Sequence, residues 1–525
     1  MTNYVGTAGA DSLNGGSSAD LFEIQQGGRD TVVGGGGDDT IQAGGALTAA
    51  DSIVGGAGTD TLRLSGDYSA GLTLANKTLT SIEWVFLSGA HDYNLTLAAD
   101  DAFALTAQDV GSDNSVVVDA SAVKSASLTL IDGQGDDVLI GGGGGDTLVG
   151  RHGGKDTLRG ADGDDRIHVG ATFTGDVFVG GDRVDGGAGY DVLQYQGPSN
   201  GGTVSLSGAA IVGIEEVIIL DGPGAVRLLD SLVAPSADLF KIYGQRTHVD
   251  ASAERDAGIW FAASWGGGNR IEGGGGNDRI EWDGPDTLIG GRGDDVFVRG
   301  EVAQNSFQAR VDGGAGRDAL HLEGVGNFDF LAWMMTGIED VWFGSNDYIE
   351  FDDSNVAAGK LLTVHVSSSL ETYTLINGSA EVDGRFSFVG GEGDETLIGG
   401  DGADVFNGGG DTDLFAGLGG ADRYLFATIE DIGPDPFTIL KGDRIEDLEA
   451  QDVIDLRAID ANQAKAGNQA FRLVDVFTNK AGQGVISYDP DEDISLLTLD
   501  VDGDGEGDGW VRMVGDHLDF TNFLL

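Results

Sequence analysis

The chain has 525 residues, with 29 Lys and Arg against 87 Asp and Glu, which gives a formal net charge of −58. So acidic a chain excludes nucleic acid and anionic membranes as electrostatic partners. It contains 91 glycines and no cysteine, so neither disulfides nor thiolate metal sites can stabilise its fold.

The N-terminal stretch MTNYVGTAGADSLNGG has no basic patch and no apolar run. No window of the sequence reaches the roughly 18 apolar residues that a membrane span needs. We therefore expect no Sec-type signal peptide and no membrane insertion. An export signal, if there is one, must lie elsewhere in the chain.

A nine-residue pattern recurs along the chain at constant phase. Examples are GGGGDDTIQ at 34–42, GGAGTDTLR at 55–63, GGGGGDTLV at 141–149, GGGGNDRIE at 273–281 and GGDGADVFN at 399–407. The shared frame is G-G-x-G-x-D-x-U-x, in which U is Leu, Ile, Val or Phe. A flexible Gly-rich linker is the alternative interpretation, but a linker would not keep an aliphatic residue in register.

Each position of this frame has a physical role. Glycines at positions 1, 2 and 4 allow positive φ and turn carbonyl oxygens inward. The Asp at position 6 adds a charged oxygen, and such oxygens in a flexible loop are the ligands that Ca²⁺ prefers. The apolar residue at position 8 predicts a short strand facing a core. The repeat thus predicts an all-β fold, an elongated right-handed parallel β-roll or β-solenoid whose neighbouring turns share ions.

The nonapeptide resembles the RTX calcium-binding repeat, a signature of repeat proteins. The resemblance implies several Ca²⁺ ions as cofactors. Because extracellular calcium modules bind at about 10⁻⁴–10⁻³ M, we expect the chain to be disordered inside the cell and folded outside. The expected metal ligands in the repeats are Asp11, Asp20, Asp30, Asp39, Asp51, Asp60, Asp137, Asp146, Asp156, Asp165, Asp191, Asn269, Asp278, Asp286, Asp295, Asp318, Glu395, Asp404, Asp413 and Asp422.

Four nonapeptide blocks alternate with three β-rich segments. The blocks cover 1–63, 132–194, 264–321 and 390–426, and the segments cover 64–131, 195–263 and 322–389. Each segment contains a matched Ile-Glu element, which reads SIEWVFL at 81–87, GIEEVIIL at 213–220 and GIEDVWFG at 337–344. Thr, Val and Leu broken by turn residues predict strands. We interpret the segments as wider coils that continue the solenoid, with an independent β-sandwich in each as the alternative.

Five tryptophans cluster in these segments, namely Trp84, Trp260, Trp265, Trp333 and Trp342. We expect them mainly in the core. Exposure for contact with a carbohydrate or a protein partner is the alternative, since aromatic side chains are frequent at binding surfaces.

The repeat stops at Phe426, and residues 427–525 form the last predicted domain. The DVIDL element at Asp452–Leu456, KAGQGVISYD at 480–489 and the acidic run at 500–508 resemble the C-terminal domain of serralysin-type metalloproteases. The resemblance implies a small β-rich cap and an uncleaved signal for a type I secretion exporter. The chain ends DFTNFLL, and Asn522 stands where that family usually has an acidic residue.

The acidic run DVDGDGEGD also matches the first nine positions of an EF-hand calcium loop, with Gly505 at the sharp turn. Position twelve is Val511 rather than Glu, so the full loop is absent. We predict a truncated calcium loop, with a solvated acidic turn as the alternative. Its expected ligands are Asp500, Asp502, Asp504 and Asp508.

The resemblance to serralysins does not extend to proteolysis. None of the seven histidines belongs to an H-E-x-x-H motif, and repeats from residue 6 onward leave no room for a catalytic domain. GPSNG at 197–201 fits G-x-S-x-G, but a Pro precedes Ser199 and no helix pattern follows, so we interpret it as a chance match. The enzymatic alternative is carbohydrate or ester hydrolysis by carboxylates of the β-rich segments. Its candidates are Glu215, Glu216, Glu339 and Asp340.

Together these observations favour a non-enzymatic, calcium-folded protein at the surface or outside of a Gram-negative bacterium. Surface-layer subunits, adhesins and biofilm matrix proteins combine such repeats with type I export. The expected partners are calcium, the exporter, and either further copies of this chain or a cell-surface polysaccharide. Solenoid ends that lack a polar cap tend to stack, and the N-terminal residues already belong to the repeat, so we expect self-association.

Overall fold

The computed structural model describes residues 1–98, 100–170, 182–196, 203–208, 210–220, 225–229, 232, 239–244, 248–263, 267–299, 309–322, 327–344, 348–367, 373–432 and 442–525. Ser199 and Trp265 lie outside these ranges. The chain divides into two compact units, Met1–Ile271 and Glu272–Leu525. Within the described ranges the structure is β, apart from the short 3-10 helices η1 (Asp353–Asn355) and η2 (Glu430–Ile432), and no helix there is long and apolar enough to span a membrane.

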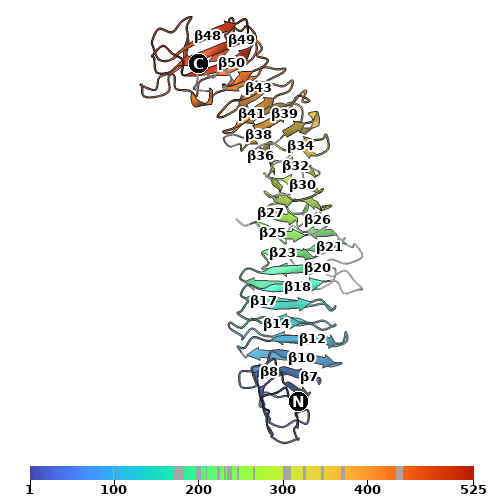
Figure 1. Ribbon diagram of the computed structural model, residues 1–525. Coiled ribbons are helices and arrows are strands. Elements are labelled where there is room, and N and C mark those ends of the chain that lie inside the picture. Colours follow the sequence, from blue (N-terminus) through green and yellow to red (C-terminus); the bar gives the residue numbers. More distant parts are fainter. Residues whose placement is uncertain are drawn as a thin grey trace. The chain divides into compact units, whose positions relative to one another are not determined.

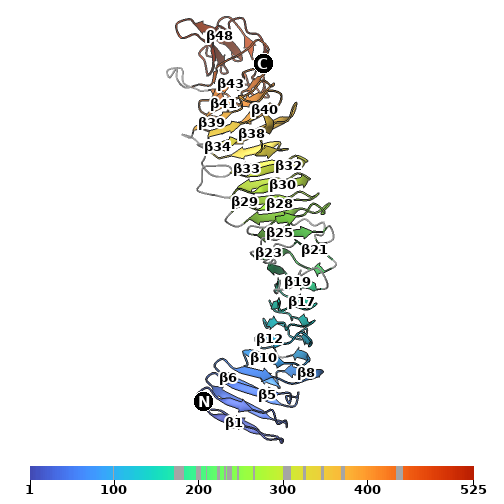
Figure 2. The same cartoon turned by 90° about the vertical axis from the view of Figure 1, so that its right-hand side faces the viewer.

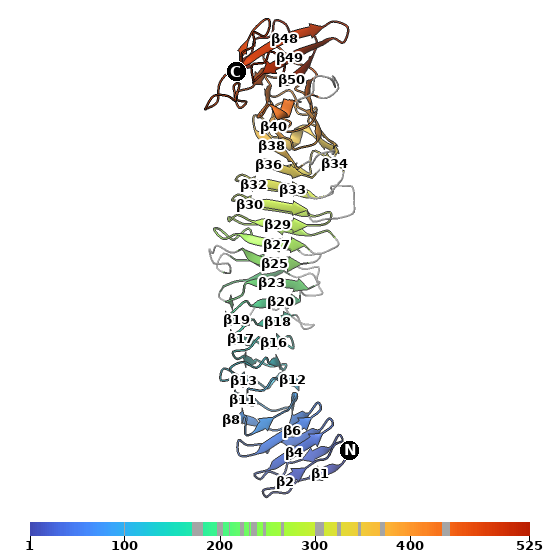
Figure 3. The ribbon, with the colours of Figure 1, turned by 60° about the vertical axis from the view of Figure 1, so that its left-hand side comes forward.

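In the first unit, successive coils place strands alternately on two faces (Figures 1 and 3). The first face is one parallel sheet of β1 (Asn3–Val5), β3 (Leu21–Glu23), β5 (Thr40–Gly44), β7 (Thr61–Leu64), β10 (Trp84–Gly89), β12 (Ala104–Val110), β14 (Thr129–Ile131), β16 (Thr147–Gly150), β18 (Arg166–Gly170), β20 (Val192–Gln196), β23 (Glu216–Leu220), β25 (Phe240–Gly244) and β27 (Ile259–Ala263).

The opposite face of this unit has three sets of parallel strands. They are β2 (Ser12–Asn14), β4 (Thr31–Gly36), β6 (Ser52–Ala57) and β9 (Leu79–Thr80); then β8 (Tyr68–Ala75), β11 (Tyr93–Ala98), β13 (Val116–Asp119), β15 (Val138–Ile140), β17 (Thr157–Asp162), β19 (Arg183–Ala188) and β22 (Ile211–Val212); then β21 (Thr203–Leu206), β24 (Ala225–Leu228) and β26 (His248–Asp250). Strand β28 (Arg270–Glu272) contains the boundary between the units.

The second unit repeats this arrangement, with successive coils stacked from β30 to β43 (Figure 2). Its first face has β29 (Arg279–Trp282), β31 (Val296–Arg299), β33 (Ala319–Leu322), β36 (Asp340–Phe343), β38 (Leu361–Val366), β40 (Arg385–Val389), β42 (Val405–Asn407), β44 (Arg423–Leu425), β46 (Val453–Asp455) and β51 (Phe523–Leu524). The opposite face has β30 (Thr287–Arg292), β32 (Arg310–Ala315) and β35 (Met335–Thr336), followed by β34 (Asn327–Phe330), β37 (Tyr348–Phe351), β39 (Tyr373–Asn377), β41 (Asp394–Ile398), β43 (Leu414–Ala416) and β45 (Arg444–Ile445).

The last strands of the second unit change direction. Strands β48 (Gln483–Asp489), β49 (Ile494–Asp500) and β50 (Gly509–Val514) are antiparallel, and β47 (Arg472–Leu473) extends their sheet. Strand β50 pairs with β45, so this small sheet continues one face of the solenoid. Strand β51 pairs with β46, which lies in the DVIDL element.

The core is a row of apolar side chains that runs through repeats and β-rich segments alike. In the first unit, position-8 residues Ile41 and Leu62 are in register with Val85 and Leu105 of the segment 64–131, and all four are buried. The segment strands therefore pair in parallel with the nonapeptide strands and continue the coil. The same holds for segment 322–389, where Val341 and Val364 stand in the row that includes Leu320 and Phe388.

The expectation that the tryptophans lie in the core is wrong for three of them. The exposed fractions are 37% for Trp84, 51% for Trp333 and 38% for Trp342. Trp84 and Trp342 each neighbour a core valine, Val85 or Val341, and alternate residues of a strand point to opposite faces. These two side chains therefore point outward.

In the second unit the apolar row of the core contains stacked aromatic rings. We expect the fold to be most sensitive to truncation of these side chains. The Phe406 ring is fully buried, 5.2 Å from the ring of Phe388 and 5.2 Å from that of Tyr424. Phe406→Ala should lower the free energy of unfolding of calcium-loaded protein by about 3–5 kcal/mol, because it leaves a cavity. Val476→Ala, at a side chain that is 71% exposed, should change it by less than about 0.5 kcal/mol. Equal urea midpoints for the two variants would contradict the prediction.

Candidate metal-binding turns

The structure buries almost all of the expected repeat ligands in the turns between strands. Asp11 is the exception and is half-buried. In the acidic run, Asp500 is buried, Asp508 is half-buried, and Asp502 and Asp504 are exposed. The buried residues are Asp20, Asp30, Asp39, Asp51, Asp60, Asp137, Asp146, Asp156, Asp165, Asp191, Asn269, Asp278, Asp286, Asp295, Asp318, Glu395, Asp404, Asp413 and Asp422.

The position-6 carboxylates form ladders from coil to coil. The Asp20 amide donates to Asp39 Oδ1 at 2.7 Å, and the Asp39 amide donates to Asp60 Oδ1 at 2.8 Å. A second ladder on the opposite turn joins Asp11 to Asp30 and Asp30 to Asp51. Each carboxylate thus holds the preceding coil by the backbone amide that lies just before its strand.

The same contact recurs in every later nonapeptide block. In the first unit it joins Asp137 to Asp156, Asp146 to Asp165 and Asp165 to Asp191. In the second unit it joins Asp278 to Asp295, Asp295 to Asp318, Glu395 to Asp413 and Asp404 to Asp422.

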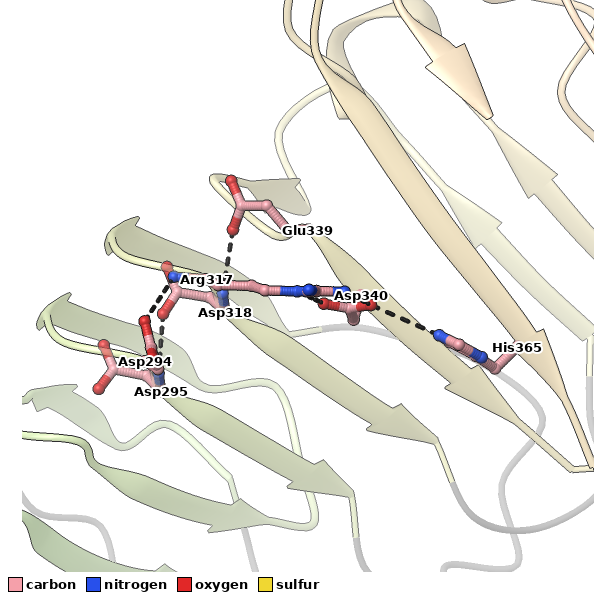
Figure 4. A network of polar contacts seen from close by, with 7 residues as sticks. All are labelled: Asp294, Asp295, Arg317, Asp318, Glu339, Asp340 and His365. Carbon is pink, nitrogen blue, oxygen red and sulfur yellow. Dashed lines mark hydrogen bonds and ion pairs between the residues drawn. The ribbon is translucent and has the colours of Figure 1, made fainter. Parts of the chain in front are cut away.

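Three ladders end on the Glu of the Ile-Glu element. The amides of Asp60, Asp191 and Asp318 donate to an Oε2 atom, at 2.6 Å to Glu83, 2.8 Å to Glu215 and 3.0 Å to Glu339. Figure 4 shows the last of these, with the Asp295–Asp318 contact one coil below. The sequence interpretation did not include these glutamates among the ligands.

Three further acids extend ladders without the glycines of the frame. Asp182, Asp443 and Asp452 accept from the amides of Asp156, Asp413 and Asp422. Each is followed by x-U, as in Asp-Arg-Val, Asp-Arg-Ile and Asp-Val-Ile. The triplet D-x-U was the signal that could have identified them.

The second carboxylate oxygen of many ladder residues is buried. The Oδ2 atoms of Asp39, Asp60, Asp165, Asp191, Asp295, Asp318 and Asp413 have no hydrogen-bond partner in the described part of the chain. A buried carboxylate oxygen without a partner is costly. A cation beside it would compensate its charge.

The position-1 glycine leaves space beside the Oδ2 atom of the Asp in its own frame. A Cβ on Gly141 would overlap Asp146 Oδ2 and the carbonyl oxygen of Gly160 in the next coil. Gly34 and Gly290 have the same surroundings, formed by the Asp of their own frame and a Gly carbonyl of the next coil. This pocket of carboxylate and carbonyl oxygens fits a hard cation such as Ca²⁺.

Asp132 departs from this frame because it stands at position 1 in place of glycine. It lies within 4.8 Å of Asp137 and Asp156, measured between ligand atoms, and all three are buried. His152 forms an ion pair with Asp132. The turn therefore gains a third carboxylate that the glycine frame does not predict.

The electrostatics of the ladders disfavour charged carboxylates in the absence of a cation. Burial, together with the neighbouring carboxylates of Asp278 and Asp318, raises the pKa of Asp295 to about 8. Burial likewise raises the pKa of Asp156 to about 8 and that of Asp165 to about 7, with neighbouring carboxylates adding to both shifts. A divalent ion bound beside these carboxylates would favour their charged form and lower their pKa values.

The four carboxylates considered for catalysis have structural contacts. Glu215 and Glu339 end ladders. Glu216 accepts from the Tyr190 hydroxyl at 2.7 Å. Asp340 forms ion pairs with Arg317 at 2.6 Å and with His365 at 3.4 Å (Figure 4). These contacts give each acid a role in the coil.

The acidic run 500–508 forms the hairpin loop between β49 and β50. Asp500 accepts from the amides of Gly503 at 2.6 Å and Gly505 at 3.1 Å. Ligand atoms of Asp500, Asp502 and Asp504 lie within 4.8 Å of one another. Both glycines have positive φ, 85° and 89°, as the sharp turn requires.

Comparison with known families agrees with this geometry. The RTX calcium-binding nonapeptide repeat matches residues 3–23, 26–62, 46–67, 129–151, 152–171, 178–194, 266–281 and 283–301. The chain carries RTX repeats, which bind several calcium ions. The Peptidase M10 serralysin C terminal family matches residues 379–525. No curated protein matches the chain significantly.

The two family matches together indicate a calcium-binding protein exported by a type I system. The RTX match stops at 301, yet the ladder of position-6 carboxylates continues at 390–426, inside the serralysin-type match. The departure at Asn522 has a structural reason. Its side-chain amide donates to the Asp452 carbonyl at 2.6 Å, which an aspartate could not do.

The space beside the position-1 glycine allows a test of the ion sites expected in the RTX turns. Gly141 has an ordinary φ, so Gly141→Ala acts through space alone. We expect the alanine to displace about one calcium ion and to destabilise the calcium-loaded fold by about 1–3 kcal/mol, because the added methyl overlaps the oxygens. Gly111→Ala is the matched control, since nothing lies within 4 Å of its added Cβ. Calcium content measured by mass spectrometry should separate the two variants, and equal ion counts would refute the assignment.

The raised pKa values predict a pH dependence for calcium-stripped protein. The folded pKa of Asp295, about 8, lies above its ordinary value of 3.8, so the folded state binds protons that the unfolded state releases. Stability from this group is therefore fully present below about pH 4 and is lost as pH rises towards 8. Far-UV circular dichroism of stripped protein should gain β signal on acidification, while calcium affinity should weaken. A signal that does not change between these pH values would contradict the burial of the carboxylates.

Proposed function

We propose that this protein is a non-enzymatic structural protein that folds on reaching extracellular calcium and then self-associates at the cell surface or in a matrix. We assign the ions to the position-6 residues of the RTX frames and to Asp500, Asp502, Asp504 and Asp508. The observation that carries the proposal is the row of buried carboxylates whose second oxygens have no hydrogen-bond partner among the described residues.

Charge supports a calcium-dependent fold. The net charge of −58 opposes collapse of the chain. If roughly a dozen ions bind, they offset about 24 charges, near half of this total. Ligands at millimolar affinity would remain empty in the cytosol and fill outside, so the unfolded chain would pass the exporter before it folds.

Surface features support an interaction role. Trp84, Trp333 and Trp342 are exposed, and exposed tryptophans are enriched where proteins contact partners. Trp342 is stacked on His365, with ring centroids 3.8 Å apart, which holds the indole in one orientation. Since the carboxylates considered for catalysis have structural contacts, a scaffold explains the site better than a hydrolase does.

Folding and association can be measured in one experiment. Protein in EGTA should give a disordered circular dichroism spectrum, and millimolar Ca²⁺ should produce a β spectrum followed by a rise in light scattering. Mg²⁺ should substitute poorly, because it demands tighter octahedral geometry. A β spectrum of equal strength in EGTA would refute the calcium switch. A strict monomer at high protein concentration and millimolar Ca²⁺ would instead refute self-association and favour an adhesin.

A further inference from the structure

The turn between β39 and β40, residues 378–384, gathers three carboxylates outside every nonapeptide frame. Ligand oxygens of Asp353, Glu381 and Asp383 lie within 4.8 Å of one another. Asp353 belongs to η1, which follows β37, and β37 pairs in parallel with β39. The cluster therefore joins the turns of two successive coils.

Glu381 lies at the centre of this cluster and is only 1% exposed. Its Oε1 accepts from the amides of Asp383 at 3.1 Å and Gly384 at 2.5 Å. Its Oε2 is buried and has no hydrogen-bond partner in the described ranges. Burial raises the pKa of Glu381, and the carboxylates of Asp353 and Asp383 raise it further.

The first β-rich segment contains the same turn with a different cap. Val123 is buried at the place of Glu381. Asp100, from the preceding coil, accepts from the amides of Lys124, Ser125 and Ala126 at 3.0–3.2 Å. One carboxylate from outside the turn is sufficient to satisfy its three amides.

The second β-rich segment caps the turn from within. Glu254, which aligns with Glu381, accepts through Oε1 from the amides of Arg255, Asp256 and Ala257 at 3.0–3.3 Å. One carboxylate is again sufficient.

The third segment has both caps at once. Asp353 Oδ1 accepts from the Val382 amide at 2.9 Å, while Glu381 accepts from the next two amides. Asp383 adds a third carboxylate. Within the described ranges none of the three forms an ion pair with a basic residue. Turn capping therefore accounts for Asp353 and for one oxygen of Glu381, while the Asp383 carboxylate and the buried second oxygen of Glu381 take no part in it.

We propose that Asp353, Glu381 and Asp383 form an additional calcium site that ties η1 to the turn at 378–384. The donor set contains only oxygen atoms, with no imidazole or thiolate, and hard cations such as Ca²⁺ prefer such ligands. This site is independent of self-association, because it lies within one chain.

The first test is the number of ions bound by the full chain. Glu381→Gln keeps the side-chain length and an acceptor for the turn amides but removes the charge. Glu381→Val reproduces the residue of the first segment, where a carboxylate from the preceding coil caps the turn. Each variant should bind one ion fewer at millimolar free Ca²⁺. Asp329→Asn, at an exposed residue of β34 outside the cluster, removes the same charge and should leave the count unchanged.

The second test separates a metal ligand from a turn cap. Hydrogen exchange of peptides that cover 353–384 should slow when calcium is added to the wild-type chain. In Glu381→Gln this calcium-dependent slowing should be lost, while protection in calcium-stripped protein should be no lower than in wild type. Equal loss of protection with and without calcium would show that Glu381 is only a cap. Either that result or an unchanged ion count overturns the proposal, while the ions of the RTX frames would still be counted.

Discussion

The fold depends on one electrostatic constraint, the stacking of buried carboxylates one coil apart. Position-6 residues such as Asp39 and Asp60 accept a backbone amide with one oxygen, while the other oxygen is buried without a hydrogen-bond partner among the described residues. Lysine and arginine number only 29 in the chain, too few to neutralise the 87 acids. Charges buried without compensation are strongly destabilising. We therefore expect strand pairing and ion binding to stabilise each other.

The thin core makes this dependence stronger. Each strand contributes few side chains to the interior, so an isolated coil buries too little apolar surface to be stable. Small cores usually need disulfides or metals, and the chain has no cysteine. Under the ion assignment proposed above, glycine turns and cations take that role, since the turn that would bind an ion also positions the neighbouring strand.

Sequence reasoning predicted the solenoid and its buried acids because the nonapeptide fixes phase, turn and strand together. It missed Glu83, Glu215 and Glu339, since these residues lie in the β-rich segments outside the nonapeptide blocks, whereas the ladder needs only an acid one residue before the strand pair x-U. It misplaced Trp84 for a different reason. Aromatic residues were assigned to the core by composition, although the alternation with Val85 already indicated the outward face.

The apolar row and the carboxylate ladders of the solenoid differ in how far they extend along the chain. The apolar row passes from a nonapeptide block into a β-rich segment without a break, as Leu62, Val85 and Leu105 show. Among the described residues, the carboxylate ladders end on Glu83 and Glu339, where the segments begin. If the ions lie beside the ladder carboxylates as we propose, ions within one block would share ligands and should bind cooperatively, whereas ions in different blocks would be coupled mainly through the apolar row. The extra carboxylates at Glu381 lie in such a segment, where the ladder is absent and where a cation would add most to the coupling between coils.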